Sequence, residues 1–282
     1  AYTLPFGLRI PSMVTIHDLS FELLPEEFGL RERWRRRFLA RRAARVAGRV
    51  ITDTEFMSSL VAKNYGVAGE RIGVVPLGID GKRFSKVERD DDIQFLKELA
   101  VRQPYVLVPG TVLERRMPRQ VLEGFAIVRR DRPKLELVFA GANRMRRPEK
   151  LDLLINELGL ESAVHQLGWV EEEALAPLYR GAELGIYVSR HEGYGLPPFE
   201  CLACGTPVVV GAGLGLDDSW PDYPFRISGF DAESIAGMIT EIFTNEGRTA
   251  RVVEATGSIM ANLDWKQSSR QLVAELRRAS SP

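Results

Sequence analysis

Cysteine is scarce in this chain of 282 residues, which contains only Cys201 and Cys204. A structural zinc site would need further ligands nearby, and His191 alone does not supply them. The CxxC spacing leaves a redox pair as the alternative interpretation. We favour two small helix-packing residues in a reducing compartment, where thiols stay free.

The chain also lacks a long apolar run and an excess of charge of either sign. It has no stretch of 18 apolar residues and no recognisable signal peptide, so we expect no spanning helix and a cytoplasmic protein. Lysine plus arginine equals aspartate plus glutamate, at 38 each, which gives no reason to expect nucleic acid as a partner. The length allows two ordinary α/β domains with buried cores.

The most informative stretch that is present is HEGYGLPPFECLACGTP, at 191–207. Apolar runs at 184–188 and 208–210 flank it, and both are typical of buried strands. Pro197 and Pro198 favour the first turn of a helix, and Gly205 followed by Pro207 predicts its end. The stretch therefore predicts a strand, a glycine turn, a short helix and a second strand, which is one unit of a parallel sheet.

The turn of this unit has the features of an anion site. Gly193 and Gly195 let the backbone approach a ligand closely, and the following helix directs free amides and a positive end out of the sheet edge. Glu192 and Glu200 flank the turn eight residues apart. Carboxylates accept hydrogen bonds from hydroxyls rather than bind phosphate, so the pattern suits a phosphorylated sugar or nucleoside.

Strands alternate with helical patterns along most of the chain, which is typical of a doubly wound parallel sheet. Such sheets bind ligands at the carboxyl ends of their strands. In the first 80 residues we expect only about three strands, at 13–17, 49–52 and 71–75. Later strands are expected at 105–108, 135–140, 164–167, 184–188 and 208–210, and helices at 30–47, 55–65, 118–130, 148–158, 171–180 and from about 232 onward.

Basic and imidazole side chains follow two of the expected strands. Arg115 and Arg116 come after Gly110 and the strand at 105–108, where guanidinium groups can clamp phosphate oxygens. An ordinary basic loop is the alternative, and the separate anion site at 193–198 makes us favour the clamp. His17 ends the first expected strand, with a structural histidine as the alternative to a site role.

Two clusters of like charge each allow a structural interpretation and a functional one. Asp90, Asp91 and Asp92 imitate a DxD metal site, but they precede a helix expected at 93–100, where acids favour the helix dipole. The helix at 30–47, which overlaps the basic segment 31–49, carries eight arginines against the single acid Glu32. We interpret it as a solvated face, with peripheral docking on the inner face of a membrane as the alternative.

Together these motifs resemble the retaining glycosyltransferases of family 4, which have the GT-B fold of two Rossmann-like domains. The resemblance covers nearly the whole chain. The family's Glu-x7-Glu signature is similar to EGYGLPPFE at 192–200, which leads into CGTPVV. Its Arg-Lys pair is similar to GTVLERRMP at 110–118. Further similar segments are LGWVEEEALAPLYRGAE at 167–183, IHDLSFELLPEEFG at 16–29, ITDTEFMSSLVAKNYGV at 51–67 and VVPLGID at 74–80.

The resemblance implies a role for each candidate residue. Glu200 would bind the ribose hydroxyls and Glu192 the transferred sugar. Arg115 and Arg116 would neutralise the departing diphosphate, and His17 would lie in the cleft as the fourth catalytic residue. The remaining donor-binding residues would be Gly110, Val170, Gly193, Tyr194, Gly195 and Leu196. No metal and no other cofactor is expected, because the basic pair replaces the metal that DxD enzymes need.

The chain departs from the family pattern in three places. Arg116 stands where the family has lysine, GLGLDDSWPDYP at 213–224 replaces a Pro-Glu pair, and the N-terminal glycine-rich loop is absent. We divide the chain into an incomplete N-terminal domain at 1–84, a nucleotide-sugar-binding domain at 85–264, and a terminal helix at 265–282 that packs back on the first domain. Because a half-built sheet exposes an unpaired edge, we expect roughly 100 further residues upstream in the intact protein.

The implied reaction moves a sugar from a nucleoside diphosphate sugar to a hydroxyl of a glycan or lipid-linked acceptor, with retention. Mannose from GDP-mannose, for polysaccharide biosynthesis, is the first expectation and glucose from UDP-glucose the second. Two alternatives stay open. One is a nucleotide-sugar 2-epimerase of the same fold, against which the Glu-x7-Glu context argues. The other is a non-catalytic nucleotide-sugar-binding fragment, which the missing N-terminal half favours.

Overall fold

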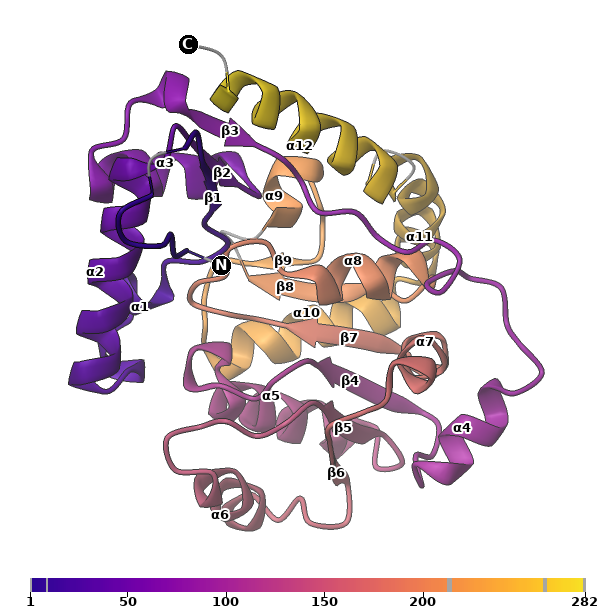
Figure 1. Ribbon diagram of the computed structural model, residues 1–282. Helices are drawn as coiled ribbons and strands as arrows, with labels where there is room; N and C mark the ends of the chain where they lie inside the picture. Colours follow the sequence, from indigo (N-terminus) through magenta and orange to yellow (C-terminus); the bar gives the residue numbers. More distant parts are fainter. Residues whose placement is uncertain (1, 9, 212–214, 261–262, 281–282) are drawn as a thin grey trace.

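The computed structural model describes residues 2–8, 10–211, 215–260 and 263–280. This part of the chain forms two parallel β-sheets with helices between successive strands (Figure 1). The predicted doubly wound α/β class is confirmed. Of the divergent stretch 213–224, Gly213 and Leu214 lie outside the described residues.

The first sheet, in the described residues, has the order β1-β2-β3, formed by Met13–Thr15, Arg49–Thr52 and Ile72–Val74. Its strands pair in parallel with Val14 opposite Val50 and Val50 opposite Ile72. The connecting helices are α1 (Ser20–Leu23), η1 (Pro25–Glu27), α2 (Leu30–Val46), α3 (Glu55–Tyr65) and η2 (Gly69–Arg71). Small residues let α2 approach the sheet closely, since Ala40, Ala43 and Ala44 are fully buried.

The second sheet, over the same described part, has the order β6-β5-β4-β7-β8-β9. Its strands are β4 (Tyr105–Pro109), β5 (Glu136–Ala140), β6 (Val164–Gly168), β7 (Leu184–Tyr187), β8 (Val208–Gly211) and β9 (Arg226–Ile227). The helices are α4 (Asp92–Glu98), η3 (Glu114–Arg116), α5 (Pro118–Asp131), α6 (Glu149–Glu157), α7 (Glu172–Gly181), α8 (Leu196–Ala203), α9 (Gly215–Ser219), α10 (Ala232–Thr244) and α11 (Glu246–Met260).

The strand order of the second sheet reverses between β4 and β7. The chain runs outward from β4 to β5 and β6 on one side, then returns to β7, β8 and β9 on the other. The central strands β4, β7 and β8 are buried along their whole length, as expected for strands covered on both faces. Such a reversal is the point where doubly wound sheets bind ligands, and here the loops after β4 and β7 meet.

The chain ends in α12 (Trp265–Ser280), which leaves the second sheet and packs against β2 of the first (Figure 1). Arg49 Nε of β2 donates to Glu275 Oε2 of α12 at 2.8 Å, and both side chains are largely buried. The two crossings between the sheets touch each other: the amide of Ile79 donates to the carbonyl oxygen of Leu263 at 2.8 Å.

Candidate active site at the sheet reversal

The glycine turn after β7 lies against the first sheet. A Cβ atom on Gly193 would stand 1.6 Å from the carbonyl oxygen of His17, so no side chain fits there. Thr54 Oγ1 also donates to the carbonyl oxygen of Gly193 at 3.2 Å. From the sequence we expected Gly193 to let a ligand approach the backbone. In the structure the backbone of His17 also lies close to this glycine. The turn is therefore held between the two sheets.

The same turn presents four consecutive unpaired amides. In the described part of the chain the backbone N–H groups of residues 193–196 donate to no acceptor. Gly195 caps α8 in a left-handed conformation with φ +82°, no side chain caps the helix, and Pro197 and Pro198 have no N–H to offer. Buried amides are almost always paired in folded proteins, so this turn is prepared for an external acceptor such as an anion.

Arg116 stands beside this turn and is held on every side. Its Nε donates to Glu192 Oε1 at 2.9 Å, its Nη1 to the carbonyl oxygen of Thr111 at 2.8 Å, and its Nη2 to the hydroxyl of Tyr187 at 2.5 Å. Gly110, with φ +85°, makes room for it, since a Cβ there would lie 2.7 Å from Arg116 Nη1. Burial opposes the charge of Arg116, but Tyr187 and Glu192 outweigh it and raise the pKa of the guanidinium.

Arg115 extends toward the first sheet and meets three carboxylates. Its Nη1 donates to Glu27 at 3.1 Å, and Asp18 and Glu192 lie at 3.9 and 3.7 Å from Nη2 and Nε. Burial raises the pKa of Glu27 although Arg115 lowers it in part. Burial would likewise raise the pKa of Asp18, but the hydrogen bond and charge of His191, with the charge of Arg115, bring it below its usual value. The two predicted clamp arginines therefore lie together, each beside carboxylates.

Two histidine–carboxylate pairs line the facing edges of the sheets. His17 lies two residues beyond β1 and is half exposed, with Nδ1 at 2.7 Å from the buried carboxylate of Asp53. His191 Nε2 lies 2.9 Å from Asp18 and is buried. Asp53, which follows β2, was not among the site residues predicted from the sequence. Because parallel strands end at one edge, its position after a predicted strand could have placed it beside His17.

Glu200 lies in α8, the helix that follows the turn. Its Oε2 accepts from the hydroxyl of Tyr179, in α7, at 2.6 Å. Burial raises the pKa of Glu200, while the hydrogen bond from Tyr179 and the charge of Arg83 lower it in part. Val170 is buried in the connection between β6 and α7.

The two remaining predicted donor-binding residues, Tyr194 and Leu196, have side chains that pack within the protein. The ring of Tyr194 stacks on Phe199 with centroids 5.0 Å apart, and its hydroxyl donates to the carbonyl oxygen of Leu77 at 3.0 Å. Leu196 packs at the edge of the core as the first residue of α8. Both side chains are engaged within the protein, so what these residues can offer a donor is their unpaired backbone amides.

Other sequence candidates have structural partners outside this site. Cys201 and Cys204 are free and buried, and burial raises the pKa of both thiols. Asp92 is more than an acid near a helix end, because its carboxylate pairs with Arg180 of α7 at 2.5 and 2.6 Å. His165 pairs with Glu136 at 2.9 Å. Across the described residues no group of three or more His, Cys, Asp or Glu is arranged to hold a metal ion.

Comparison with known families accounts for both sheets. Residues 90–257 match the family Glycosyl transferases group 1, and residues 1–83 match Glycosyltransferase Family 4. The chain belongs to the group 1 glycosyltransferases. The resemblance predicted from the Glu-x7-Glu signature is thereby confirmed.

The relatives of this group 1 glycosyltransferase chain include several named enzymes. Mannosylfructose-phosphate synthase of Agrobacterium fabrum is 26% identical over 95% of this chain and 63% of its own length. D-inositol 3-phosphate glycosyltransferase of Mycolicibacterium smegmatis is 29% identical over 83% of this chain and 54% of its own length. The chain thus spans about half to two thirds of the length of these relatives.

Solved structures show the same fold. Sucrose-phosphate synthase of Thermosynechococcus elongatus superposes with a TM-score of 0.80 at 21% identity, covering 96% of this chain and 68% of that one. HepE of Anabaena, solved with UDP and glucose, gives a TM-score of 0.78 at 21% identity, covering 95% and 71%. The predicted GT-B fold is confirmed.

Proposed function

We propose that this chain carries the donor site of a retaining hexosyltransferase, which moves a sugar from a nucleoside diphosphate sugar to a hydroxyl. The observation that carries the proposal is the turn at 193–196, whose four unpaired amides lie beside the buried guanidinium of Arg116. Unpaired amides beside guanidinium groups suit the two phosphates of such a donor.

The chemistry follows from where negative charge appears. As the bond from the anomeric carbon to the diphosphate breaks, the leaving oxygens gain charge that the amides, Arg115 and Arg116 stabilise. The acceptor oxygen bonds to the same carbon from the same face, and its proton passes to the departing diphosphate. Glu192 would accept from a hydroxyl of the transferred sugar, Glu200 from the ribose, and His17 would face the cleft from the first sheet.

A variant series tests this division of roles by calorimetry with GDP and UDP. Arg115→Ala and Arg116→Ala each remove charge-assisted bonds of about 1.5–3 kcal/mol, so nucleotide affinity should fall about ten- to a hundredfold. Glu200→Ala should also weaken the nucleotide. Glu192→Ala removes a bond to Arg116 rather than a contact to the nucleotide, so nucleotide affinity should fall less than in Glu200→Ala while turnover falls about a hundredfold. If Glu192→Ala loses nucleotide affinity as badly as Glu200→Ala, the assignment of the two carboxylates is wrong.

For the donor we propose GDP-mannose first and UDP-glucose second. The names of two relatives, mannosylfructose-phosphate synthase and MMP alpha-(1->4)-mannosyltransferase, support mannose, and the HepE complex with UDP-glucose supports glucose. A glycan or lipid-linked hydroxyl is the proposed acceptor. Radiolabelled donors separate the alternatives: label transferred to an acceptor supports the proposal, a 2-epimer of the donor indicates an epimerase, and binding without either product indicates a binding fragment.

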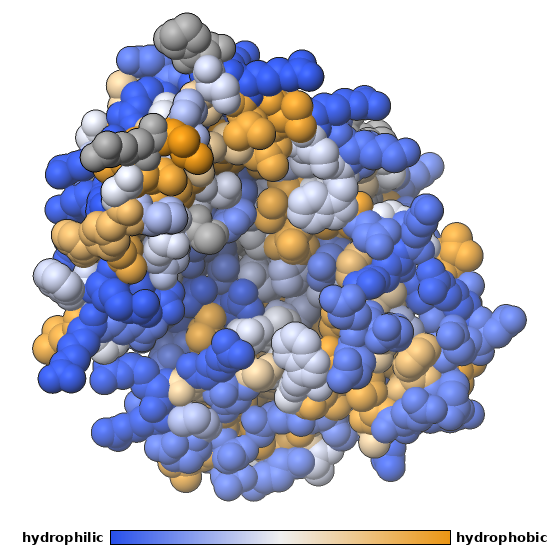
Figure 2. Space-filling view, viewed as in Figure 1, coloured by the Kyte–Doolittle hydropathy of each residue, from blue (hydrophilic) through white to orange (hydrophobic). Residues whose placement is uncertain are grey.

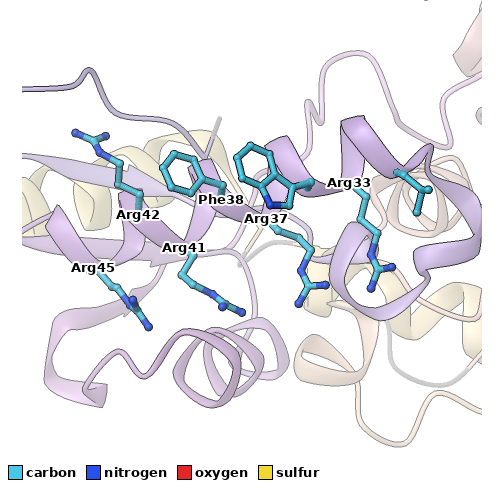
Figure 3. Close-up of a pocket in the computed structure, with 8 residues that line it drawn as sticks. Arg33, Arg37, Phe38, Arg41, Arg42 and Arg45 are labelled. Atoms are coloured by element: carbon cyan, nitrogen blue, oxygen red, sulfur yellow. The ribbon is translucent and has the colours of Figure 1, made fainter.

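The surface of α2 supports a peripheral membrane contact as part of the proposal. Two rows of side chains four residues apart run along it: Arg33, Arg37, Arg41 and Arg45 in one, and Leu30, Trp34, Phe38 and Arg42 in the other (Figure 3). Trp34 is 70% exposed and stacks on Phe38 at 5.5 Å. Figure 2 shows hydrophilic and hydrophobic side chains interleaved along the left edge, where Figure 1 places α2. In the described residues no helix is long and apolar enough to cross a bilayer.

Arginine interleaved with exposed aromatic rings suits an anionic lipid surface, where each basic residue adds about 1 kcal/mol. We expect the chain to bind vesicles containing anionic lipid, and salt to release it. Arg33→Gln with Arg45→Gln should weaken binding about tenfold or more, and Trp34→Ala should weaken it further. The control pair Arg251→Gln and Arg270→Gln, on α11 and α12, removes equal charge elsewhere and should change little. Equal binding to neutral vesicles, or equal loss in both pairs, contradicts the contact.

A further inference from the structure

Tyr187 is the last residue of β7 and differs from the rest of that strand. Leu184, Gly185 and Ile186 are apolar and buried, as is usual for a central parallel strand. Tyr187 is only 3% exposed, and a buried phenol hydroxyl requires a hydrogen-bond partner. Its partners therefore indicate what a polar group does at this position.

Both parts of the Tyr187 side chain contact Arg116. The hydroxyl accepts from Nη2 at 2.5 Å, and the guanidinium carbon lies 4.6 Å from the centre of the ring. A cation over an aromatic face and a hydrogen bond to the same ring's hydroxyl fix the planar guanidinium in position and in orientation. Lysine, the residue expected here from the family pattern, could not make this forked contact.

The charge of Glu192 also acts on Tyr187, since together with burial it raises the pKa of the phenol. Glu192 in turn accepts from Arg116 Nε at 2.9 Å, so Arg116 links the hydroxyl of Tyr187 to the carboxylate of Glu192. The three side chains come from three separate segments: β7, η3 and the turn that follows β7. Burial is the larger cause of the raised pKa of Tyr187, so the hydroxyl stays protonated beside Arg116.

The amide turn rests on the same ring. A Cβ atom on Gly195 would lie 3.3 Å from Cε1 of Tyr187, which is tight contact. One side chain thus touches the arginine proposed to neutralise the diphosphate and the turn that offers the amides, and through that arginine it is linked to the carboxylate proposed to hold the sugar.

We propose that Tyr187 is a positioning residue of this site, whose hydroxyl sets the direction in which Arg116 faces the donor and, through Arg116, the direction of Glu192. The inference rests on the proposed function, because it assigns to Tyr187 the alignment of groups that would meet diphosphate and sugar. Tyr187 need not touch the donor to act in this way.

The test is a double-mutant cycle on nucleotide binding, with GDP and UDP as the probes. Tyr187→Phe keeps the ring over Arg116 and removes only the hydroxyl. We expect it to weaken the nucleotide about tenfold, the usual effect of losing a hydrogen bond to a charged group. Arg116→Lys keeps the charge but removes the forked contact. In that background Tyr187→Phe should weaken the nucleotide no further, because its partner nitrogen is already gone.

Tyr105→Phe is the matched control. Tyr105 is also a buried tyrosine of a central strand, and its hydroxyl donates to the carbonyl oxygen of Leu178 at 2.7 Å, away from the arginines. Its effect on nucleotide affinity should be small and the same in both backgrounds. With whichever donor the wild type turns over, Tyr187→Phe should also lower kcat by more than it raises KM, because Arg116, which binds Glu192, loses part of its alignment.

The outcomes separate this inference from the proposed function. A wild-type chain that binds neither nucleotide overturns the proposed function and the positioning role with it. A wild-type chain that binds, with Tyr187→Phe equal to wild type or equally costly in the Arg116→Lys background, overturns the positioning role alone. A loss of nucleotide affinity in Tyr187→Phe that is absent when Arg116 is replaced by lysine supports the positioning role.

Discussion

Glu200 and Tyr179 form a buried pair whose behaviour should depend on pH. Burial raises the pKa of Glu200, whereas the hydroxyl of Tyr179 and the charge of Arg83 lower it in part. As an ionised carboxylate Glu200 can accept from two ribose hydroxyls, and as a neutral acid it accepts less well. Ribose binding should therefore be strong above the raised pKa and weaken as the pH falls through it.

We expect the affinity for GDP or UDP to fall on acidification at a higher pH than an ordinary glutamate would give. Glu200→Gln should remove this dependence, and subtracting its profile removes the titration of the diphosphate itself. Tyr179→Phe deletes a bond that lowers the pKa, so its midpoint should shift to higher pH. Calorimetry across pH measures all three, and coincident profiles for Tyr179→Phe and wild type would falsify the pairing.

At the scale of single residues, the sequence identified charged groups better than their partners. Spacing and flanking prolines indicated Glu192, Glu200 and the anion turn, because helix ends and glycine turns leave a local pattern. Tyr179 and Tyr187 left no such signal. Each is embedded in an apolar run, and only the packed structure shows that the hydroxyl of Tyr179 meets Glu200 and that of Tyr187 meets Arg116.

At the scale of elements, most predicted helices and strands appear within one or two residues of their expected bounds. The strand at 49–52 and the helix at 55–65 coincide with β2 and α3. Thr54 caps α3 by accepting from the amide of Met57, and Gly66 ends it in a left-handed conformation. Local caps and periodicity carry such information, whereas the ion pairs between elements arise only from packing.

The contact of α12 with β2 should make a measurable contribution to stability. Glu275→Ala leaves the guanidinium of Arg49 largely buried without its carboxylate, which costs about 3 kcal/mol for a buried pair. Urea denaturation followed by circular dichroism measures the change. Arg278→Ala is the control, because Arg278 pairs with the same carboxylate but is 66% exposed, so its loss should cost about 0.5 kcal/mol or less. Equal effects of the two variants would show that α12 does not depend on Arg49.

At the scale of the whole molecule, Gly193 controls how closely the signature turn approaches the first sheet. In Gly193→Ala the new methyl would stand 1.6 Å from the carbonyl oxygen of His17, so turn and sheet must move apart. We expect a larger radius of gyration in solution scattering and a loss of transfer activity. Gly237→Ala, in α10 with open space around it, is the matched control and should stabilise the helix by about 0.5–1 kcal/mol. An unchanged radius for Gly193→Ala would contradict this arrangement.

This approach of the two sheets could not be predicted from the sequence. Glycine at 193 fits both a ligand and a neighbouring backbone, and nothing within its own segment distinguishes them. The reason lies in His17, 176 positions earlier in the chain. The fold class follows from repeated local patterns, but the distance between the sheets depends on contacts that no local pattern records.

The paired crossings between the sheets have a mechanical consequence. The chain passes from the first sheet near Gly78 and Ile79 and returns near Leu263 and Trp265, and the two passages are joined by a backbone hydrogen bond. A Cβ on Gly78 would lie 2.4 Å from the nitrogen of Trp265, so they touch with no space between them. Because the two connectors are fixed to each other, they restrict rotation of one sheet relative to the other. The movement that remains is bending of the two sheets about the line of the connectors. If either connector were cut, the remaining one alone would not prevent the two sheets from rotating relative to each other.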